Sequence, residues 1–118
     1  MACEVGADAI VVSNHGGRQL DGARSTISAL PEVVEAVAGR CEVLFDGGVR
    51  TGQDVLKALA LGAKGCLVGK AFLYALAANG EAGVALMLDV IRKELAVSLA
   101  LTGANDVRKV TSEILVRR

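Results

Sequence analysis

The sequence predicts an α/β fold in which short parallel strands alternate with helices. Three short apolar stretches predict the strands, at residues 9–13, 42–46 and 65–69. Continuous apolar runs of this length are typical of strands that are buried on both faces, as in a parallel sheet. Helical patterns lie between and after them, and this alternation predicts right-handed parallel crossovers.

The first two helices are predicted between the strands. Apolar residues recur at helical spacing over residues 30–37, where Pro31 is expected in the first turn. The second helix is predicted to begin at Thr51, because its hydroxyl and the Asp54 carboxylate can satisfy the first N–H groups. Gly62 is expected to end it.

The rest of the chain is predicted to be helical and then irregular. A short helix is expected over residues 71–78, and a long amphipathic helix over 81–101 is predicted to cover the sheet. Tyr74 and Cys66 are expected to be packed residues. Residues 102–118 are predicted to form a short turn and a tail that lies on the surface or contacts a partner.

The composition indicates one soluble globular domain over residues 1–118. The chain is 53% hydrophobic and has 13 basic and 13 acidic side chains, so no net charge attracts nucleic acid or an anionic membrane. Cys3, Cys41 and Cys66 are odd in number and lack a paired spacing, so neither a disulfide framework nor a zinc site is predicted. We therefore expect a cytoplasmic location. No signal peptide or membrane-spanning helix is predicted, because lysines and glycines interrupt the apolar stretch at 58–78.

A sheet of three parallel strands is incomplete as a fold. Both of its edges would be open, and both faces need helices that this chain only partly contains. The first residues, 2–7, also read as the end of a helix. We therefore expect the chain to be a piece of a larger (β/α)₈ barrel.

Unusual residues follow each predicted strand, where such a barrel carries its reactive groups. The first strand leads into SNHGGRQLDG at residues 13–22, which holds the only histidine, and the second leads into DGGVR at 46–50. The third ends at Gly69 and Lys70, directly before the short helix. Because barrels commonly bind phosphate at the loops after their last two strands, this arrangement predicts a phosphate site.

The predicted phosphate cradle consists of glycine amides and two cations. The N–H groups of Gly47, Gly48 and Gly69 can approach phosphate oxygens because no Cβ intervenes, and Arg50 and Lys70 supply positive charge. DGG alone is more often turn chemistry. The combination DGGVRTGQDVLKALALGAKGCLVGK couples two strand ends at the right separation, and it favours phosphate.

His15 and Arg18 predict a base and a carboxylate-binding cation. Histidine can remove a proton near neutral pH, and a guanidinium can hold a carboxylate through two parallel hydrogen bonds. The alternative is a polar turn with a structural histidine and solvated charges. Asp21 is expected to cap this turn or to pair with Arg18 or Arg24.

Four segments together resemble one enzyme family. SNHGGRQLDG, LPEVVEAV, DGGVRTGQDVLKALALGAKGCLVGK and LYALAANGEAGV are similar to the C-terminal part of the FMN-dependent α-hydroxy acid oxidases and dehydrogenases. This group includes glycolate oxidase, lactate oxidase and dehydrogenase, and mandelate dehydrogenase. The resemblance extends to about Leu101. It implies a TIM (β/α)₈ barrel with FMN at its mouth, of which residues 1–118 form a partial domain: the last three βα units and the terminal helices.

The resemblance also implies roles for individual residues. His15 matches the base and Arg18 the group that holds the substrate carboxylate, in the oxidation of an L-2-hydroxy acid of the lactate or glycolate type to the 2-oxo acid. His15 would take the hydroxyl proton as hydride passes to FMN, or the α-proton in a carbanion route. The residues that match the FMN phosphate loops are Asp46, Gly47, Gly48, Arg50, Gly69 and Lys70, the last standing where the family typically has arginine.

The family's other active-site residues belong to an N-terminal half that this sequence does not contain. We therefore expect that the isolated chain neither retains FMN tightly nor turns over a hydroxy acid, and we expect a homo-oligomer or a complementing N-terminal half-barrel as partner. One alternative is a noncatalytic half-barrel that binds phosphate or FMN. Another is a phosphate-binding barrel similar to inosine monophosphate dehydrogenase or the FMN-dependent isopentenyl isomerases, against which the His15 and Arg18 pair argues.

Overall fold

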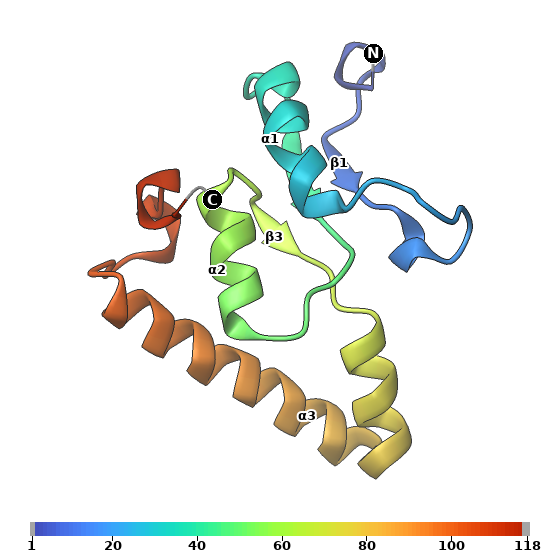
Figure 1. The fold of residues 1–118 in the computed structure, drawn as a ribbon, viewed down its shortest axis with the longest axis vertical. Coiled ribbons are helices and arrows are strands. Elements are labelled where there is room, and N and C mark those ends of the chain that lie inside the picture. The colour runs from blue at the N-terminus through green and yellow to red at the C-terminus, as the bar shows by residue number, and fades with distance from the viewer. Residues whose placement is uncertain (1, 117–118) are drawn as a thin grey trace.

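A computed structural model describes residues 2–116 of the chain. It contains three parallel strands alternating with three α-helices, which confirms the predicted α/β order. Short 3-10 turns precede, interrupt and follow these elements. The strands are β1 (Ala9–Val12), β2 (Glu42–Phe45) and β3 (Gly65–Cys66), and the helices are α1 (Thr26–Val37), α2 (Gly52–Ala60) and α3 (Lys70–Leu101), as Figure 1 shows.

The strands pair side by side in chain order, and both pairs are parallel. Val12 lies opposite Phe45, which lies opposite Cys66. The hydrogen bonds between the strands continue one residue beyond the strand ends. Asp46 N donates to Val12 O at 3.0 Å, and Leu67 N donates to Phe45 O at 2.8 Å. The C-terminal ends of all three strands therefore meet at one edge of the sheet.

The core lies between α1, α2 and one face of the sheet. Successive right-handed crossovers in one direction place both helices on the same face. Leu30 of α1 and Ala58 of α2 are fully buried there, in a cluster with Val43 and Phe45 of β2. Val11 points to the opposite face and is 50% exposed. The expectation of strands buried on both faces is therefore wrong for β1, because the two helices cover only one of them.

The predicted cap of α2 is confirmed. Thr51 Oγ1 accepts a hydrogen bond from Asp54 N at 3.2 Å, and Asp54 Oδ2 accepts one from Thr51 N at 3.0 Å. Gly62 follows the helix with a φ of +102°, and a Cβ there would lie 2.7 Å from Val34 Cγ1 of α1. A glycine is needed at this position for both its backbone conformation and its contact with α1.

Pro31 lies inside α1 and not in its first turn, which corrects the prediction. The helix begins at Thr26, whose buried hydroxyl donates to Gly47 O at 3.1 Å. This contact with the loop after β2 holds an additional turn of helix ahead of the proline. The apolar periodicity of residues 30–37 does not reveal such a polar contact.

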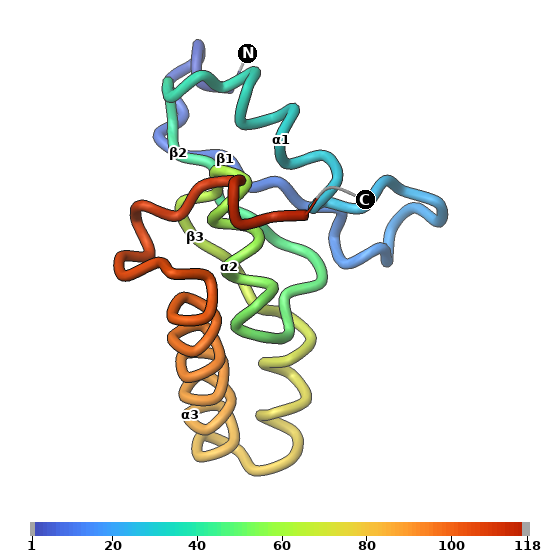
Figure 2. The backbone as a smooth tube through the Cα atoms, turned by 60° about the vertical axis from the view of Figure 1, so that its left-hand side comes forward, coloured from blue at the N-terminus to red at the C-terminus, as the bar shows by residue number. Residues whose placement is uncertain are grey.

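The structure joins the two predicted C-terminal helices into one element, α3, which bends sharply. Asn79 and Gly80 leave the helical conformation, with φ values of −154° and +55°. The chain turns back on itself there (Figures 1 and 2). The two arms approach closely at Gly83, where a Cβ would collide with the carbonyl oxygen of Ala75. Helix α3 is therefore a helical hairpin. Gly80 permits the bend, and Gly83 permits the close contact between the two arms.

The second arm of α3 packs on α2 and not on the sheet, so that expectation is also wrong. A Cβ on Gly52 of α2 would collide with Leu95 N, and it would lie 2.5 Å from Ile91 O. Gly52 N donates to Glu94 Oε2 at 2.8 Å. The reason is that α2 already occupies the face of the sheet.

Between residues 2 and 116, no helix is both long and apolar enough to cross a membrane.

The residues after α3 form two 3-10 turns, Val107–Lys109 and Ser112–Ile114, which contact α2 (Figure 2). The predicted tail therefore folds back on the domain over its described part, and residues 117–118 lie outside the described residues.

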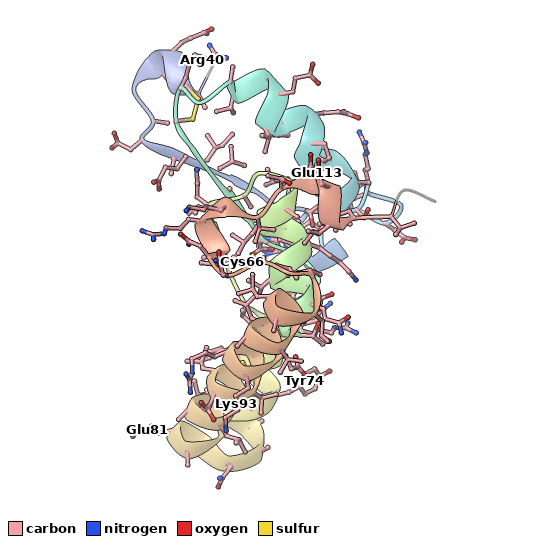
Figure 3. The ribbon with its side chains drawn as sticks, turned by 90° about the vertical axis from the view of Figure 1, so that its left-hand side faces the viewer. Arg40, Cys66, Tyr74, Glu81, Lys93 and Glu113 are labelled. Carbon is pink, nitrogen blue, oxygen red and sulfur yellow. A yellow bond between two sulfur atoms is a disulfide. The ribbon has the colours of Figure 1, made fainter. Side chains whose placement is uncertain are left out.

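Tyr74, on the first arm of α3, is 77% exposed, so the prediction that it packs is wrong (Figure 3).

Cys3 and Cys41 form a disulfide, with their Cα atoms 5.9 Å apart, which corrects the expectation of unpaired cysteines (Figure 3). Cys3 precedes β1 and Cys41 immediately precedes β2. Parallel pairing of these strands brings their N-terminal ends together, although 38 residues separate the two cysteines in sequence. Cys66 is free and partly buried against the core.

Candidate functional site

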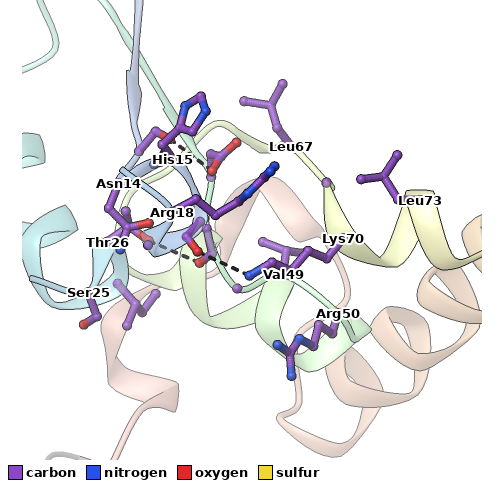
Figure 4. Close-up of a pocket in the computed structure, with 18 residues that line it drawn as sticks. Asn14, His15, Arg18, Ser25, Thr26, Val49, Arg50, Leu67, Lys70 and Leu73 are labelled. Atoms are coloured by element: carbon purple, nitrogen blue, oxygen red, sulfur yellow. Dashed lines mark hydrogen bonds between the residues drawn. The ribbon is translucent and has the colours of Figure 1, made fainter. Parts of the chain in front are cut away.

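A cavity of about 470 Å³ opens where the C-terminal ends of the three strands meet (Figure 4). Its volume lies in the range of small-molecule sites. Four segments line it: the loop after β1, the first turn of α1, the loop after β2, and the chain between β3 and the first turn of α3. The cavity brings together all the predicted site residues: His15, Arg18, Asp46, Gly47, Gly48, Arg50, Gly69 and Lys70.

His15 begins a 3-10 turn, His15–Gly17, which Ser13 and Asn14 separate from the end of β1. His15, Gly16 and Gly17 have φ values of +58°, +68° and +72°. Two glycines adopt this left-handed conformation without strain, whereas it is unfavourable for histidine. The His15 N–H donates to Ser13 Oγ at 3.1 Å, and the Ser13 hydroxyl donates to Asp46 Oδ1 at 3.1 Å. The turn that carries the candidate base is thus connected to the loop after β2.

Arg18 follows this turn and is exposed. Figure 4 shows its side chain extending toward the part of the cavity formed by Leu67 and Leu73. Its guanidinium has no hydrogen-bond or ion-pair partner among residues 2–116, and Arg24 pairs instead with Glu32 at 2.7 Å. Asp21 Oδ1 accepts a hydrogen bond from Gly22 N at 3.0 Å. Of the alternatives for Asp21, the turn cap is therefore confirmed, and Arg18 is left available for a ligand.

The glycines after β2 have different roles. Gly47 and Gly48 have φ values of +98° and +95°. A Cβ on Gly47 would lie 2.8 Å from Thr26 Oγ1 and 3.1 Å from Asn14 Oδ1, whereas a Cβ on Gly48 would meet nothing within 4 Å. Gly47 is therefore enclosed by α1 and the loop after β1, and Gly48 leaves backbone open to the cavity.

The cationic end of the cavity lies where α3 begins. Gly69 is the N-cap residue of α3 and provides no side-chain cap, so the first N–H groups of the helix are available to an anion. Arg50 and Lys70 line the same cavity. Lys70 Nζ donates to Gly16 O at 3.2 Å, so it also contacts the His15–Gly17 turn.

These residues fit the phosphate of FMN. Two cations, an uncapped helix N-terminus and an open glycine backbone favour a dianionic group at this end of the cavity. The Asp46 carboxylate carries the same charge as phosphate and accepts a hydrogen bond from the Ser13 hydroxyl, so we expect Asp46 to support the loop around the phosphate without contacting the phosphate through its carboxylate. Over residues 2–116, no three His, Cys, Asp or Glu side chains are placed to hold a metal ion.

Sequence reasoning gave no role to four polar residues that line the cavity: Ser13, Asn14, Ser25 and Thr26. Ser13 and Asn14 lie beside His15 in the SNHGG motif, which was a usable signal. Asn14 Nδ2 donates to Arg24 O at 3.3 Å, while its buried Oδ1 has no partner among the described residues. Thr26 gave no signal, because its contact with Gly47 depends on how α1 lies against the loop.

The model of the FMN-dependent dehydrogenase family matches residues 1–117. The chain belongs to the FMN-dependent dehydrogenase family. Among curated proteins, it is 57% identical over 117 residues to an L-lactate dehydrogenase of Caulobacter vibrioides (strain NA1000 / CB15N). This match covers 99% of this chain and 30% of that protein. It is 53% identical over 116 residues to an L-lactate dehydrogenase of Ectopseudomonas mendocina (strain ymp), covering 98% of this chain and 31% of that protein.

Solved structures give the same family. A crystal structure of mandelate oxidase with benzoyl-formic acid superposes with a TM-score of 0.87 at 54% identity, covering 90% of this chain and 32% of that chain. A mandelate oxidase variant with 2-hydroxy-phenylacetamide gives a TM-score of 0.89 at 52% identity, covering 92% of this chain and 33% of that chain. The chain thus spans about a third of the relatives that it matches, and its small parallel sheet is consistent with a partial TIM barrel.

Proposed function

We propose that this chain supplies the base, the carboxylate-binding arginine and the FMN phosphate cradle of an enzyme that oxidises an L-2-hydroxy acid to its 2-oxo acid. The observation that carries the proposal is that one cavity joins His15 and Arg18, which follow the first strand, to the cationic loops that follow the next two strands. The similarity to L-lactate dehydrogenases and to mandelate oxidase supports this reaction class. We favour a small substrate of the lactate or glycolate type.

The phosphate of FMN would bind between Gly48, Arg50, Gly69 and Lys70. Backbone N–H groups provide directional hydrogen bonds, and the two side chains neutralise the charge of the phosphate. Lys70 is a compact charge that cannot form the fork of an arginine. Arg50 is therefore the only guanidinium of this cradle and the cation with the more specific geometry.

The substrate would bind at the other end of the cavity. Arg18 pairs with the carboxylate and fixes the orientation of the α-carbon. His15 then removes a proton, either from the hydroxyl group or from the α-carbon. FMN, when bound, would supply the redox chemistry as the acceptor of two electrons.

We also propose that the chain is the C-terminal part of the barrel and that a complementing N-terminal half-barrel completes it. Val11 and Leu67 are 50% and 45% exposed, respectively, and the free edge of β1 can pair with another strand. A second copy of the chain and a noncatalytic half-barrel are the alternatives. We expect the isolated chain to be inactive. A cytoplasmic location remains proposed, but the Cys3–Cys41 disulfide removes the argument from unpaired cysteines, because disulfides are rare in that compartment.

The first experiment is an FMN titration of the purified chain, followed by flavin fluorescence, with inorganic phosphate as competitor and molecular size measured in parallel. Weak but saturable binding that phosphate displaces is expected, and Arg50→Met should weaken it further. The matched control is Arg92→Met, because Arg92 lies on α3 and pairs with Asp89 outside the cavity. Failure of the folded chain to bind FMN would contradict a self-contained cradle.

The second experiment tests the reaction and separates the rival functions. The chain is coexpressed with the N-terminal part of a related L-lactate dehydrogenase, and oxidation of L-lactate and glycolate is measured. Activity only in the complemented pair is expected. Arg18→Met should raise the substrate KM of that pair; an unchanged KM would contradict the role of Arg18. FMN binding without activity in the assembled pair would favour the noncatalytic half-barrel.

A further inference from the structure

We propose that Ser13 and Asp46 are positioning residues that hold His15 in its left-handed backbone conformation through the path Asp46 Oδ1, Ser13 Oγ, His15 N. The inference rests on the proposed function in one respect, namely that His15 is the base. It gives Asp46 a role other than contact with phosphate. It also gives a role to Ser13, for which the sequence predicted none.

The backbone of His15 needs such support. Among residues 2–116, only His15 and Ala38 have a positive φ without being glycine. Ala38 ends α1, where a left-handed residue is a normal helix terminus. His15 instead lies in an exposed turn between two loops, where its conformation is unfavourable for a residue with a Cβ. A non-glycine residue remains in this region only if its surroundings hold it there.

The direction of each hydrogen bond follows from chemistry. A serine hydroxyl has one hydrogen to donate and lone pairs to accept with. The Asp46 carboxylate can only accept, so the hydrogen of Ser13 points to Asp46 Oδ1 at 3.1 Å. A lone pair of Ser13 Oγ then faces the His15 N–H, which lies 3.1 Å away. The carboxylate therefore fixes the rotation of the hydroxyl, and the hydroxyl fixes the backbone of His15.

The sheet provides a firm base for this path. Asp46 N donates to Val12 O at 3.0 Å, so the backbone of Asp46 is tied to the end of β1, next to Ser13. The far side of the turn is tied as well, because Lys70 Nζ donates to Gly16 O at 3.2 Å. The turn carrying the imidazole is thus held from the loop after β2 at the His15 N–H and from α3 at the Gly16 carbonyl.

The test uses hydrogen exchange of the His15 amide in the full chain, measured by NMR. We expect Ser13→Ala and Asp46→Ala each to raise this exchange rate by about five- to tenfold, the factor that corresponds to one ordinary hydrogen bond. The amide of Leu67, bonded to Phe45 O in the sheet, is the internal reference and should be unaffected. A rise shared equally by Leu67 would indicate general unfolding and overturn the proposal.

Conservative variants separate positioning from a general loss of packing. Ser13→Thr retains the hydroxyl and should keep the exchange rate within about twofold of the native chain, since the hydrogen bond persists. The matched control is Asp21→Asn, because within residues 2–116 the Asp21 carboxylate accepts a hydrogen bond only from Gly22 N of the same loop. The double variant S13A/D46A should exchange no faster than either single variant, because both break one path. Additive effects would overturn the proposal.

The imidazole gives a second readout. Because the chain has one histidine, the ring Cε1–H resonance of His15 is unambiguous. It should shift in Ser13→Ala and Asp46→Ala and return in Ser13→Thr; a resonance unchanged in both alanine variants would contradict positioning. Inorganic phosphate is titrated into the same samples. If phosphate does not bind but the Ser13 and Asp46 variants change His15 exchange as expected, the result counts against the proposed function alone. If phosphate binds but these variants leave His15 exchange unchanged, the result counts against this inference alone.

Discussion

Lys70 Nζ donates a hydrogen bond to Gly16 O at 3.2 Å and so connects the first turn of α3 to the turn that carries His15 (Figure 4). The two residues are 54 positions apart in the sequence. A lysine ammonium has three hydrogens, so Lys70 can keep this contact and also face a phosphate. The candidate anion site and the turn that carries the candidate base are therefore neighbours, and the Lys70 side chain contacts both.

Lys70→Met is expected to weaken FMN binding by about tenfold or more, because it removes a charged donor from the cradle. Lys70→Arg should bind at least as tightly as the native chain, since a guanidinium can hold two phosphate oxygens. Flavin fluorescence titrations measure both. The control is Lys64→Met, because Lys64 is exposed and does not line the cavity. Equal affinity in Lys70→Met and the native chain would remove Lys70 from the cradle.

Gly52→Ala is expected to lower the free energy of unfolding by more than about 2 kcal/mol, because a Cβ there collides with backbone and not with a movable side chain. The collision is with Leu95 N of α3. Urea denaturation followed by circular dichroism measures the change. Gly69→Ala is the control, because its Cβ would meet nothing within 4 Å and its φ is −99°. Similar losses in the two variants would argue against close packing of α2 on α3.

The cysteine pair predicts a specific labelling pattern. In the unfolded, unreduced chain, an alkylating reagent should add to Cys66 only, because Cys3 and Cys41 are joined. After reduction, all three should react. The bond should contribute about 2–4 kcal/mol to the free energy of unfolding, since it constrains the unfolded chain. Mass spectrometry measures the first result and denaturation the second; three labels before reduction would contradict the pairing.

Cys66 should react slowly with iodoacetamide in the folded chain. Burial, with a smaller contribution from the negative charge of Asp54, raises the pKa of its thiol to about 11. Because the thiol loses its proton more readily when unfolded, the folded state binds more protons between about pH 9 and 11, and stability falls as pH rises through that interval. Alkylation rates against pH measure the shift. A Cys66→Ser variant should lose this part of the pH dependence; a rate that rises near pH 8.5 would contradict burial of the thiol.

Much of the site was predictable because local patterns and one topological rule suffice. Apolar runs predict strands, and the carboxyl ends of parallel strands meet at one edge of the sheet. His15, Gly48 and Lys70 therefore come together wherever those strands pair. The capping residues Thr51 and Asp54 were predictable for a similar reason, because their contacts reach only three residues along the chain.

The remaining features depend on contacts between segments that no local pattern encodes. The pairing of Cys3 with Cys41 follows from which strands are neighbours, and the extra turn of α1 before Pro31 follows from the contact of Thr26 with Gly47. The second arm of α3 lies on α2 because α2 already covers the sheet.

Residue types and their spacing are enough to specify the alternation of strands and helices, the position of the polar loops and the family. Folding in three dimensions alone places Asp46 within hydrogen-bonding distance of Ser13, and with it the backbone of His15, since hydrogen bonds act over a few ångströms between residues that the chain keeps far apart.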